Sequence, residues 1–315
     1  MRCMDQSTPS KLLRLKHADQ CVEISPALGG TILNYRWRDV AILRPTDGVP
    51  ETARLTACYP LVPFSNRIAN GRMAFHGKVY PIPRTVDYAA LPMHGLTWQR
   101  PWRVASHDDR RAVLFQDYTP EAETPAWPFP FAAEQTFELT GTGLRVTLTV
   151  RNTGAAPQPM GVGWHPYFPR TPETRVWADV GDMWVNDPAN LPVRLAPPPS
   201  ALHTGMAVLH TDYDNVFRDF RGRARIAWPE RDAAVTMSAD ATLSHLVVFT
   251  PPGKPHLAVE PVSHMTDAFN RYSAHGGKPV PGVDPETGTA VLAPDRTLHA
   301  TMFLRPTTLA DAAPW

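Results

Sequence analysis

The sequence predicts an all-β protein built from many short, mostly antiparallel strands with little helix. Its 315 residues include 35 prolines, about twice the usual share of roughly 5%. Proline breaks helix interiors but is accepted in turns and at strand edges. The clearest hairpin is predicted at residues 134–151, where two β-forming runs flank the turn at 141–143 and the second run alternates apolar and polar side chains. This period of two is typical of a half-buried antiparallel strand.

The other strands are predicted from short β-forming runs bounded by turn residues. In the first half we expect strands at 22–24, 31–37, 40–43, 102–106 and 112–116, and a hairpin at 73–80 that turns at His76-Gly77. In the second half we expect short runs at 176–177, 183–185, 206–209, 223–227, 235–237 and 246–249, a strand at 256–261, and a closing strand at 297–304. The prolines at 197–199 indicate a stiff connector within a loop, and the Gly/Pro-rich residues 273–288 indicate a long loop.

We expect one domain over residues 1–315, with residues 1–20 as a loosely held segment. The length alone permits one large β domain or two smaller ones. Hydrophobic residues make up 43% of the chain, enough for a sizeable core, and we find no internal repeat and no convincing helix longer than a few turns. A single all-β domain is the simplest architecture that uses these elements.

The charge balance favours a small neutral ligand over a large anionic partner. The formal net charge is +1 and no basic block is present, so we expect neither nucleic acid nor a membrane surface as partner.

The three cysteines at positions 3, 21 and 58 form no CxxC pair, which argues against a disulfide framework or a zinc site. Free thiols suit a reducing compartment. The N-terminus lacks a signal-peptide pattern, and no apolar run is long enough to span a bilayer. We therefore expect a cytoplasmic protein.

Residues 161–168 place His165 among Trp164, Tyr167 and Phe168. Pro166 favours an extended backbone at His165, and the glycines before it favour a bulge or a close backbone approach. An imidazole held between aromatic rings suits acid–base chemistry on a ring-shaped, mostly neutral substrate. The alternative is a core strand whose histidine is satisfied internally.

Four other segments carry candidate polar residues, each with an ordinary structural alternative. Arg67 follows Asn66 in an apolar, proline-rich segment, and either aims at substrate oxygens or lies in a solvated turn. His94 lies in a loop between Pro92 and Gly95, where a functional and a surface position are both possible. Asp214 either belongs to an Asx-type turn or contacts substrate. Glu260 is expected at the end of an apolar strand just before a proline, either solvated or as a base at a cleft.

Several classes of site are poorly supported. There is no HxH or HExxH pair, so we predict no metal site. There is no GxSxG, GxGxxG or Walker-type loop, which argues against serine acyl transfer, hydride transfer and nucleotide hydrolysis. A glycosidase with paired carboxylates stays possible in principle.

Taken together, the candidate segments resemble the aldose 1-epimerase (galactose mutarotase-like) family. Five segments match in the family's order and span most of the chain, and their coincidence is far more specific than any one of them. The matching segments are residues 63–68 with Asn70-Gly71, His94-Gly95, residues 163–168, residues 214–217, and residues 259–261 with residues 267–270.

The resemblance implies a β-supersandwich fold with an open cleft, no cofactor, and a monosaccharide substrate. It implies that Glu260 is the general base that takes the anomeric hydroxyl proton, and that His165 is the general acid that protonates the ring oxygen. His94 would hold or polarise the region of the ring oxygen. The ring opens, the C1–C2 bond rotates, and reclosure gives the other anomer. The residues implied to bind sugar hydroxyls are Asn66, Arg67 and Asp214.

Two departures from the galactose-type members bear on which sugar is bound. Residues 94–98 read His-Gly-Leu-Thr-Trp without a second glycine, and residues 261–263 after Glu260 read Pro-Val-Ser instead of beginning Thr-Gln. Arg72, Arg84 and Arg100 lie near matched segments, so an epimerase for a hexose 6-phosphate or another acidic sugar is one alternative. It requires two or more arginines at one end of the cleft. A non-catalytic carbohydrate-binding protein is another. Both a monomer and a homodimer fit the sequence.

Overall fold

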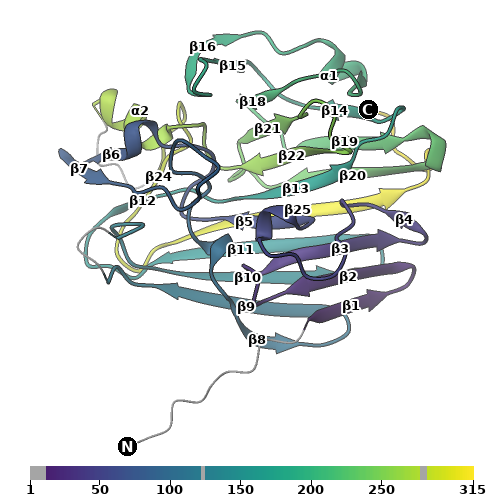
Figure 1. The fold of residues 1–315 in the computed structure, drawn as a ribbon, viewed down its shortest axis with the longest axis horizontal. Helices are drawn as coiled ribbons and strands as arrows, with labels where there is room; N and C mark the ends of the chain where they lie inside the picture. Colours follow the sequence, from purple (N-terminus) through teal and green to yellow (C-terminus); the bar gives the residue numbers. More distant parts are fainter. Residues whose placement is uncertain (1–11, 122–124, 277–281) are drawn as a thin grey trace, which may run out of the picture.

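The computed structural model describes residues 12–121, 125–276 and 282–315, and two large antiparallel sheets dominate it (Figure 1). The first sheet contains β1 (Leu13–His17), β2 (Gln20–Ser25), β3 (Thr31–Trp37), β4 (Val40–Ala41), β5 (Cys58–Leu61), β13 (Gly163–Pro169), β15 (Met183–Asn186), β16 (Pro192–Ala196), β18 (Asp214–Phe217), β21 (His245–Phe249) and β22 (His256–Val262). Their order is β1-β2-β3-β5-β13-β22-β21-β18-β15-β16, with β4 paired to β3. The expected all-β class is confirmed.

The second sheet has nine strands and contains the predicted hairpin. Its members are β8 (Arg103–His107), β9 (Arg111–Tyr118), β10 (Phe131–Leu139), β11 (Leu144–Asn152), β14 (Arg175–Ala178), β17 (Met206–Ala207), β19 (Arg223–Trp228), β20 (Ala233–Ala239) and β25 (Thr297–Thr307). They follow the order β17-β14-β19-β20-β25-β11-β10-β9-β8. β10 and β11 pair from Leu139–Leu144 to Phe131–Asn152, so the hairpin at 134–151 is confirmed.

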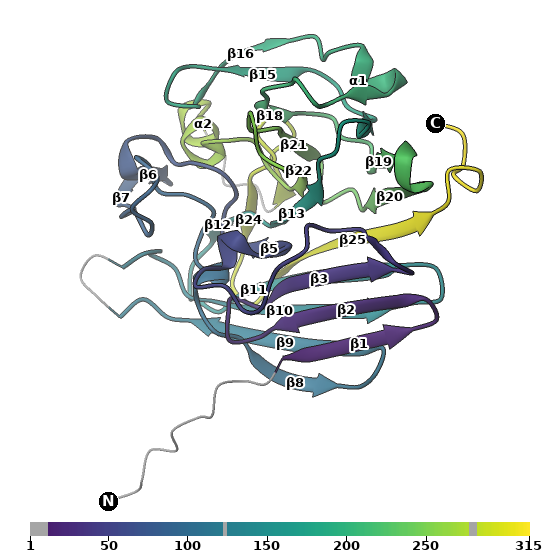
Figure 2. The same ribbon diagram turned by 45° about the vertical axis from the view of Figure 1, so that its right-hand side comes forward.

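Two small sheets and a few short helices complete the described chain. The small sheets are β12 (Gln158–Met160) with β24 (Ala290–Leu292) and β23 (Gly282–Val283), and β6 (Arg72–Phe75) with β7 (Lys78–Pro81). The α-helices are α1 (Ala201–Thr204) and α2 (Ala268–Ala274), and the 3-10 turns are η1 (Ala53–Leu55), η2 (Ala69–Gly71), η3 (Thr97–Gln99) and η4 (Pro229–Arg231). The hairpin at 73–80 is confirmed as β6 and β7, and Figures 1 and 2 both show it beside α2.

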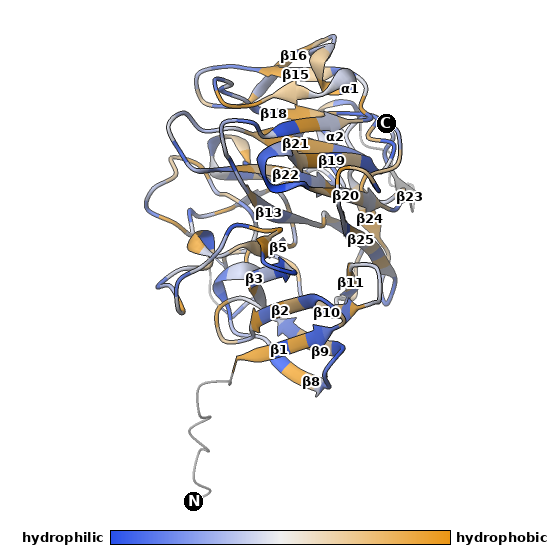
Figure 3. Cartoon of the chain, turned by 90° about the vertical axis from the view of Figure 1, so that its right-hand side faces the viewer, coloured by the Kyte–Doolittle hydropathy of each residue, from blue (hydrophilic) through white to orange (hydrophobic). Residues whose placement is uncertain are grey.

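The main core lies between the two large sheets, which Figure 3 shows one beside the other. The alternation in β11 explains how this core forms, because Leu144, Val146, Leu148 and Val150 are all fully buried while Arg145 and Arg151 are exposed. Strands with period two put one face on the core and the other in solvent. The same interleaved colouring of hydrophobic and hydrophilic residues is visible along the strands in Figure 3.

The structure corrects three expectations of local structure. Residues 13–17 of the expected loose segment 1–20 form β1 and pair with β2, while residues 1–11 lie outside the described residues. The expected loop at 273–288 begins inside α2 and includes β23 at residues 282–283, and residues 277–281 lie outside the described part. β22 continues to Val262, so Glu260 is an interior residue of a central strand and not its end.

Two of the three cysteines are described, and both are free thiols. Cys58 is buried in β5, and Cys21 is half-buried in β2. Cys3 lies in the N-terminal residues that are not described.

Candidate active site

The candidate site is built on the face of the first sheet that points away from the second sheet. Its floor consists of two rows of side chains that run across five neighbouring strands, since residues in register on adjacent strands share a face. One row is Tyr59, His165, Glu260, Val247 and Val216, and the other is Tyr167, Ala258, Phe249 and Asp214. The sheet register therefore brings together groups that lie up to about two hundred residues apart in the sequence.

The period of two in β13 decides which aromatic rings reach the site. The side chains of His165 and Tyr167 belong to the floor, and both line the cavity. Trp164 points the other way into the core between the sheets, where its indole N–H donates to Gln135 Oε1 at 2.9 Å. Phe168 belongs to the same core. Trp164 and Phe168 are thus packing residues.

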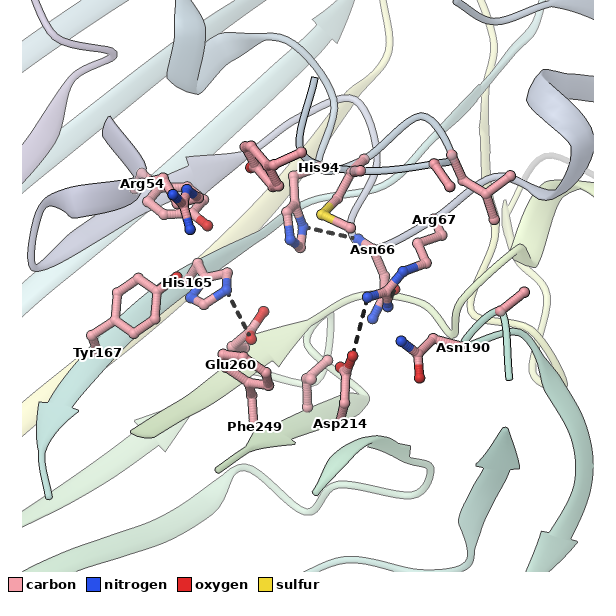
Figure 4. Close-up of a pocket in the computed structure, with 18 of the residues that line it drawn as sticks. Arg54, Asn66, Arg67, His94, His165, Tyr167, Asn190, Asp214, Phe249 and Glu260 are labelled. Carbon is pink, nitrogen blue, oxygen red and sulfur yellow. Dashed lines mark hydrogen bonds and ion pairs between the residues drawn. The ribbon is translucent and has the colours of Figure 1, made fainter. Parts of the chain in front are cut away.

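His165 and Glu260 are in direct contact, with 3.2 Å between Nε2 and Oε1 (Figure 4). The Cα pairing of β13 with β22 is interrupted between Gly163–Val262 and Tyr167–Ala258, and both residues lie in this interval. Pro166 and Pro261 lie in the same interval. Because proline has no backbone N–H, the opened ladder leaves fewer donors unpaired.

Both members of the pair are almost completely buried, which favours their neutral forms. Burial is the main cause that holds the pKa of His165 well below 6.5, and His94 and Arg44 add to it. Burial likewise raises the pKa of Glu260 well above 4.5, with a further contribution from Asp214. A neutral pair and an ion pair contain the same single proton. The arrangement therefore holds one proton that either residue can carry.

His94 reaches the site from the loop expected in the sequence. It has a left-handed backbone conformation with a φ of 62°, and its Nδ1 accepts the backbone N–H of Asn66 at 3.1 Å. A backbone N–H can only donate, so the proton of this neutral imidazole lies on Nε2. Burial, aided by Arg67, lowers the pKa of His94 to about 3. His94 can therefore serve as a fixed hydrogen-bond donor across the neutral pH range.

Arg67 and Asp214 form an ion pair at the opposite side of the cavity from Tyr167 (Figure 4). Arg67 Nη2 donates to Asp214 Oδ2 at 3.1 Å, and Arg67 Nη1 donates to Asn66 Oδ1 at 2.9 Å. The segment that carries Asn66 and Arg67 is also held by His264, whose Nε2 accepts the backbone N–H of Ser65 at 3.1 Å. Asp214 begins β18 and has a side-chain partner in Arg67, so it is more than a turn residue.

All six predicted site residues line one cavity of about 510 Å³. This volume lies in the range of small-molecule sites. The further lining residues that sequence reasoning did not select include Arg54, Tyr59, Tyr88, Asn190 and Phe249. Tyr59 lies in β5, and its place in the site is recognisable only once the register of β5 with His165 in β13 is known. Asn190 and Tyr88 come from loops, for which the sequence offers no positional signal.

Within the described ranges, no group of three or more His, Cys, Asp or Glu side chains has the arrangement of a metal site. None of the helices formed by the described chain is long and apolar enough to cross a bilayer.

Comparison with known proteins yields one family. The sequence profile described as "Aldose 1-epimerase" matches residues 11–290. The uncharacterized protein YphB of Escherichia coli K12 is 30% identical over 305 residues, which cover 92% of this chain and 97% of YphB.

Solved structures of similar fold superpose on nearly the whole chain. One from Escherichia coli K12, described provisionally as an aldose 1-epimerase, superposes with a TM-score of 0.83 at 27% identity and covers 95% of this chain and 99% of its own. A galactose mutarotase-like protein of Clostridium acetobutylicum has a TM-score of 0.80 at 21% identity, with coverage of 94% and 95%. The expected galactose mutarotase-like fold is confirmed.

Proposed function

The chain belongs to the aldose 1-epimerase family, and we propose that it interconverts the α and β anomers of a free aldose without a cofactor. The observation that supports this most directly is the 3.2 Å contact between His165 Nε2 and Glu260 Oε1. Ring opening of an aldose moves a proton from the anomeric hydroxyl and delivers a proton to the ring oxygen. Both oxygens are bonded to C1, so the base and the acid must be neighbours.

The proposed step balances within the pair. The step starts from the ion-pair form, in which the shared proton is on His165. Glu260, as carboxylate, takes the proton of the anomeric hydroxyl while the C1–O5 bond breaks and C1 becomes a carbonyl. His165, as imidazolium, gives its proton to O5. Rotation about C1–C2 exposes the other carbonyl face, and the reverse transfers close the ring. The single proton that burial leaves on the pair is sufficient for this cycle.

The other side chains are proposed to orient the ring. His94 would donate its Nε2 hydrogen to the ring oxygen region, since its Nδ1 is occupied by Asn66. Arg67, Asn66 and Asp214 would hydrogen-bond the hydroxyls on the far side of C1. Arg67 supplies a rigid fork of donors, and the Asp214 carboxylate accepts from a hydroxyl.

A neutral sugar fits the charges better than a hexose 6-phosphate. Arg72, Arg84 and Arg100 are absent from the residues that line the cavity in the described chain. The arginines that do line it, Arg54 and Arg67, lie on opposite sides (Figure 4). Arg67 is neutralised by Asp214 at 3.1 Å. The two arginines at one end that a phosphate requires are therefore not assembled in this cavity.

The test is anomer exchange of freshly dissolved α-aldoses, followed by polarimetry or NMR, with wild type and Glu260→Gln. We expect wild type to accelerate exchange and the variant to lose roughly a hundredfold to ten-thousandfold of that rate, the usual worth of one positioned proton transfer. Glu134→Gln, at an exposed position of β10, is the matched control and should behave as wild type.

Two outcomes would count against the proposal. A wild type that accelerates no aldose while still binding sugar would indicate a carbohydrate-binding protein. A Glu260→Gln variant as fast as wild type would remove Glu260 from the role of base.

A further inference from the structure

A second cavity of about 600 Å³ adjoins the candidate active site. The two cavities share Arg54 and Tyr88 in their walls, and the Arg54 guanidinium lies 4.4 Å from the centre of the Tyr88 ring. Tyr88 is 52% exposed, so this pair forms a solvent-accessible partition between the two cavities and not a core contact.

The backbone around Arg54 holds its side of the partition in place. Arg54 lies in η1, and the carbonyl oxygen of Arg54 accepts a hydrogen bond from Arg44 at 2.9 Å. The neighbouring Ala53 is buried. The Arg54 side chain is exposed and lines both cavities, so its guanidinium can donate to a ligand on either side.

The lining of the second cavity suits a neutral molecule rich in hydroxyl groups. Its polar part, beyond Arg54 and Tyr88, consists of the carboxylates of Glu51 and Asp87 and the neutral side chains of Thr52, Thr85 and Gln99, and its apolar part includes Leu28, Val86 and Trp98. Carboxylates accept from hydroxyls, while amide and guanidinium groups donate to them. An anionic group would meet two carboxylates and one guanidinium there, which disfavours it.

The geometry of the first cavity indicates which sugar atom faces this partition. If Glu260 holds the anomeric hydroxyl and His165 the ring oxygen, C2 points toward Asp214 and Arg67. C5 is bonded to the ring oxygen, so C5 and its C6 substituent lie on the His165 side. Figure 4 shows Arg54 on that same side, across the cavity from Arg67, Asp214 and Asn190.

We propose that the second cavity is a subsite for a further sugar unit attached through O6 of the reducing aldose, so that the enzyme acts on reducing oligosaccharides as well as on monosaccharides. This rests on the proposed epimerase function. The linkage must leave the anomeric hydroxyl free, because a C1-linked unit has no proton for Glu260 to remove. The partition residues Arg54 and Tyr88 would contact the bridging oxygen and the first atoms of the second unit.

The experiment compares anomer exchange of glucose, isomaltose (1→6-linked) and maltose (1→4-linked) in wild type and Thr52→Trp. Thr52 is exposed and lines only the second of the two cavities, so an indole there fills the subsite. We expect wild type to have a higher kcat/KM for isomaltose than for maltose. We expect Thr52→Trp to lower the isomaltose-to-glucose ratio of kcat/KM by about tenfold, equivalent to about 1.4 kcal/mol. Thr142→Trp, in the exposed hairpin turn, should leave the ratio unchanged.

Binding of the same sugars to Glu260→Gln, measured by calorimetry, separates this inference from the proposed function. Tighter binding of isomaltose than of glucose, abolished when Thr52→Trp is added, supports the subsite even if wild type accelerates no sugar. Equal binding of isomaltose and maltose, or an unchanged ratio in Thr52→Trp, overturns it while leaving the epimerase intact. A preference for glucose 6-phosphate over isomaltose that is lost in Arg54→Ala also overturns it, in favour of an anion site.

Discussion

Glu260 and His165 illustrate how burial sets the chemistry of single residues. A carboxyl group and an imidazole ordinarily titrate near 4.5 and 6.5. In this site the surroundings disfavour charge on both, and the shifts run in opposite directions because the two groups are charged in opposite protonation states. The pair therefore keeps one proton over a wide pH interval.

The pH dependence of anomer exchange follows from these directions. On the acid side of the pH profile, kcat/KM falls when the His165–Glu260 pair takes up a second proton. Because the pKa of His165 is held well below 6.5, kcat/KM should not fall as the pH drops through 6.5. On the alkaline side, kcat/KM falls when the pair loses its shared proton. The raised pKa of Glu260 moves this loss to a pH well above 4.5. The measurement is the enzyme-dependent rate from pH 5 to 9 after the buffer-catalysed rate is subtracted. A half-maximal rate near pH 6.5 would mean that the acid is a solvent-exposed histidine.

At the scale of elements, the loop that carries His94 depends on a close backbone approach. Gly95 has a φ of 68° and forms a parallel bridge with Val62. A Cβ added at Gly95 would overlap the carbonyl oxygen of Val62. The same oxygen accepts the N–H of Leu96 at 2.7 Å. His94 is thus positioned by a contact that only glycine permits.

Gly95→Ala should therefore cost both stability and activity. We expect a loss of more than about 2 kcal/mol in the free energy of unfolding, since backbone strain and a steric overlap combine. Gly77→Ala is the matched control, because Gly77 also has a positive φ, 73°, but a Cβ there meets nothing within 4 Å. It should cost only about 1 kcal/mol and leave anomer exchange unchanged. Chemical denaturation and rate measurements on both variants check this, and equal losses would contradict the role of the Val62 contact.

On the scale of the whole molecule, several histidines are buried in neutral form. Burial lowers the pKa of His94 and of His245 to about 3 and that of His264 to about 4. In the unfolded chain these groups would titrate near 6.5. A group whose pKa is lower in the folded state is stabilising above its unfolded pKa, and this stability is lost as the pH falls from about 6.5 toward the folded value.

We therefore expect the protein to become acid-labile below pH 6.5. Each such histidine should lower the free energy of unfolding by about 1.4 kcal/mol per pH unit between 6.5 and its folded pKa. His245→Gln should reduce this slope by one proton, because His245 is buried and is not among the residues that line the cavity. His203→Gln, at an exposed position, should not. Urea titrations at pH 4.5, 5.5 and 6.5 measure the slope. An unchanged slope in His245→Gln would show that His245 does not take up a proton on unfolding.

The sequence by itself determined the class of the fold and the chemical types at the site. Period-two patterns and proline content predicted the strands because they report local backbone preference and the sidedness of a sheet. Pre-proline positions predicted that His165 and Glu260 are extended, and both lie within strands. The loop position of His94 was predicted from its flanking proline and glycine.

Only the tertiary structure decided which of these residues meet. His165 and Glu260 lie on strands whose pairing spans about a hundred residues of intervening chain, and a shift of one residue would have turned either side chain to the opposite face. The same register sent Trp164 to the core and Tyr167 to the cavity. Arg54 comes from the short turn η1, and Tyr88 and Asn190 come from loops; the paths of these segments depend on packing against the finished sheet. Long-range register and loop path are set by the burial of the whole core, which no local window of the sequence contains.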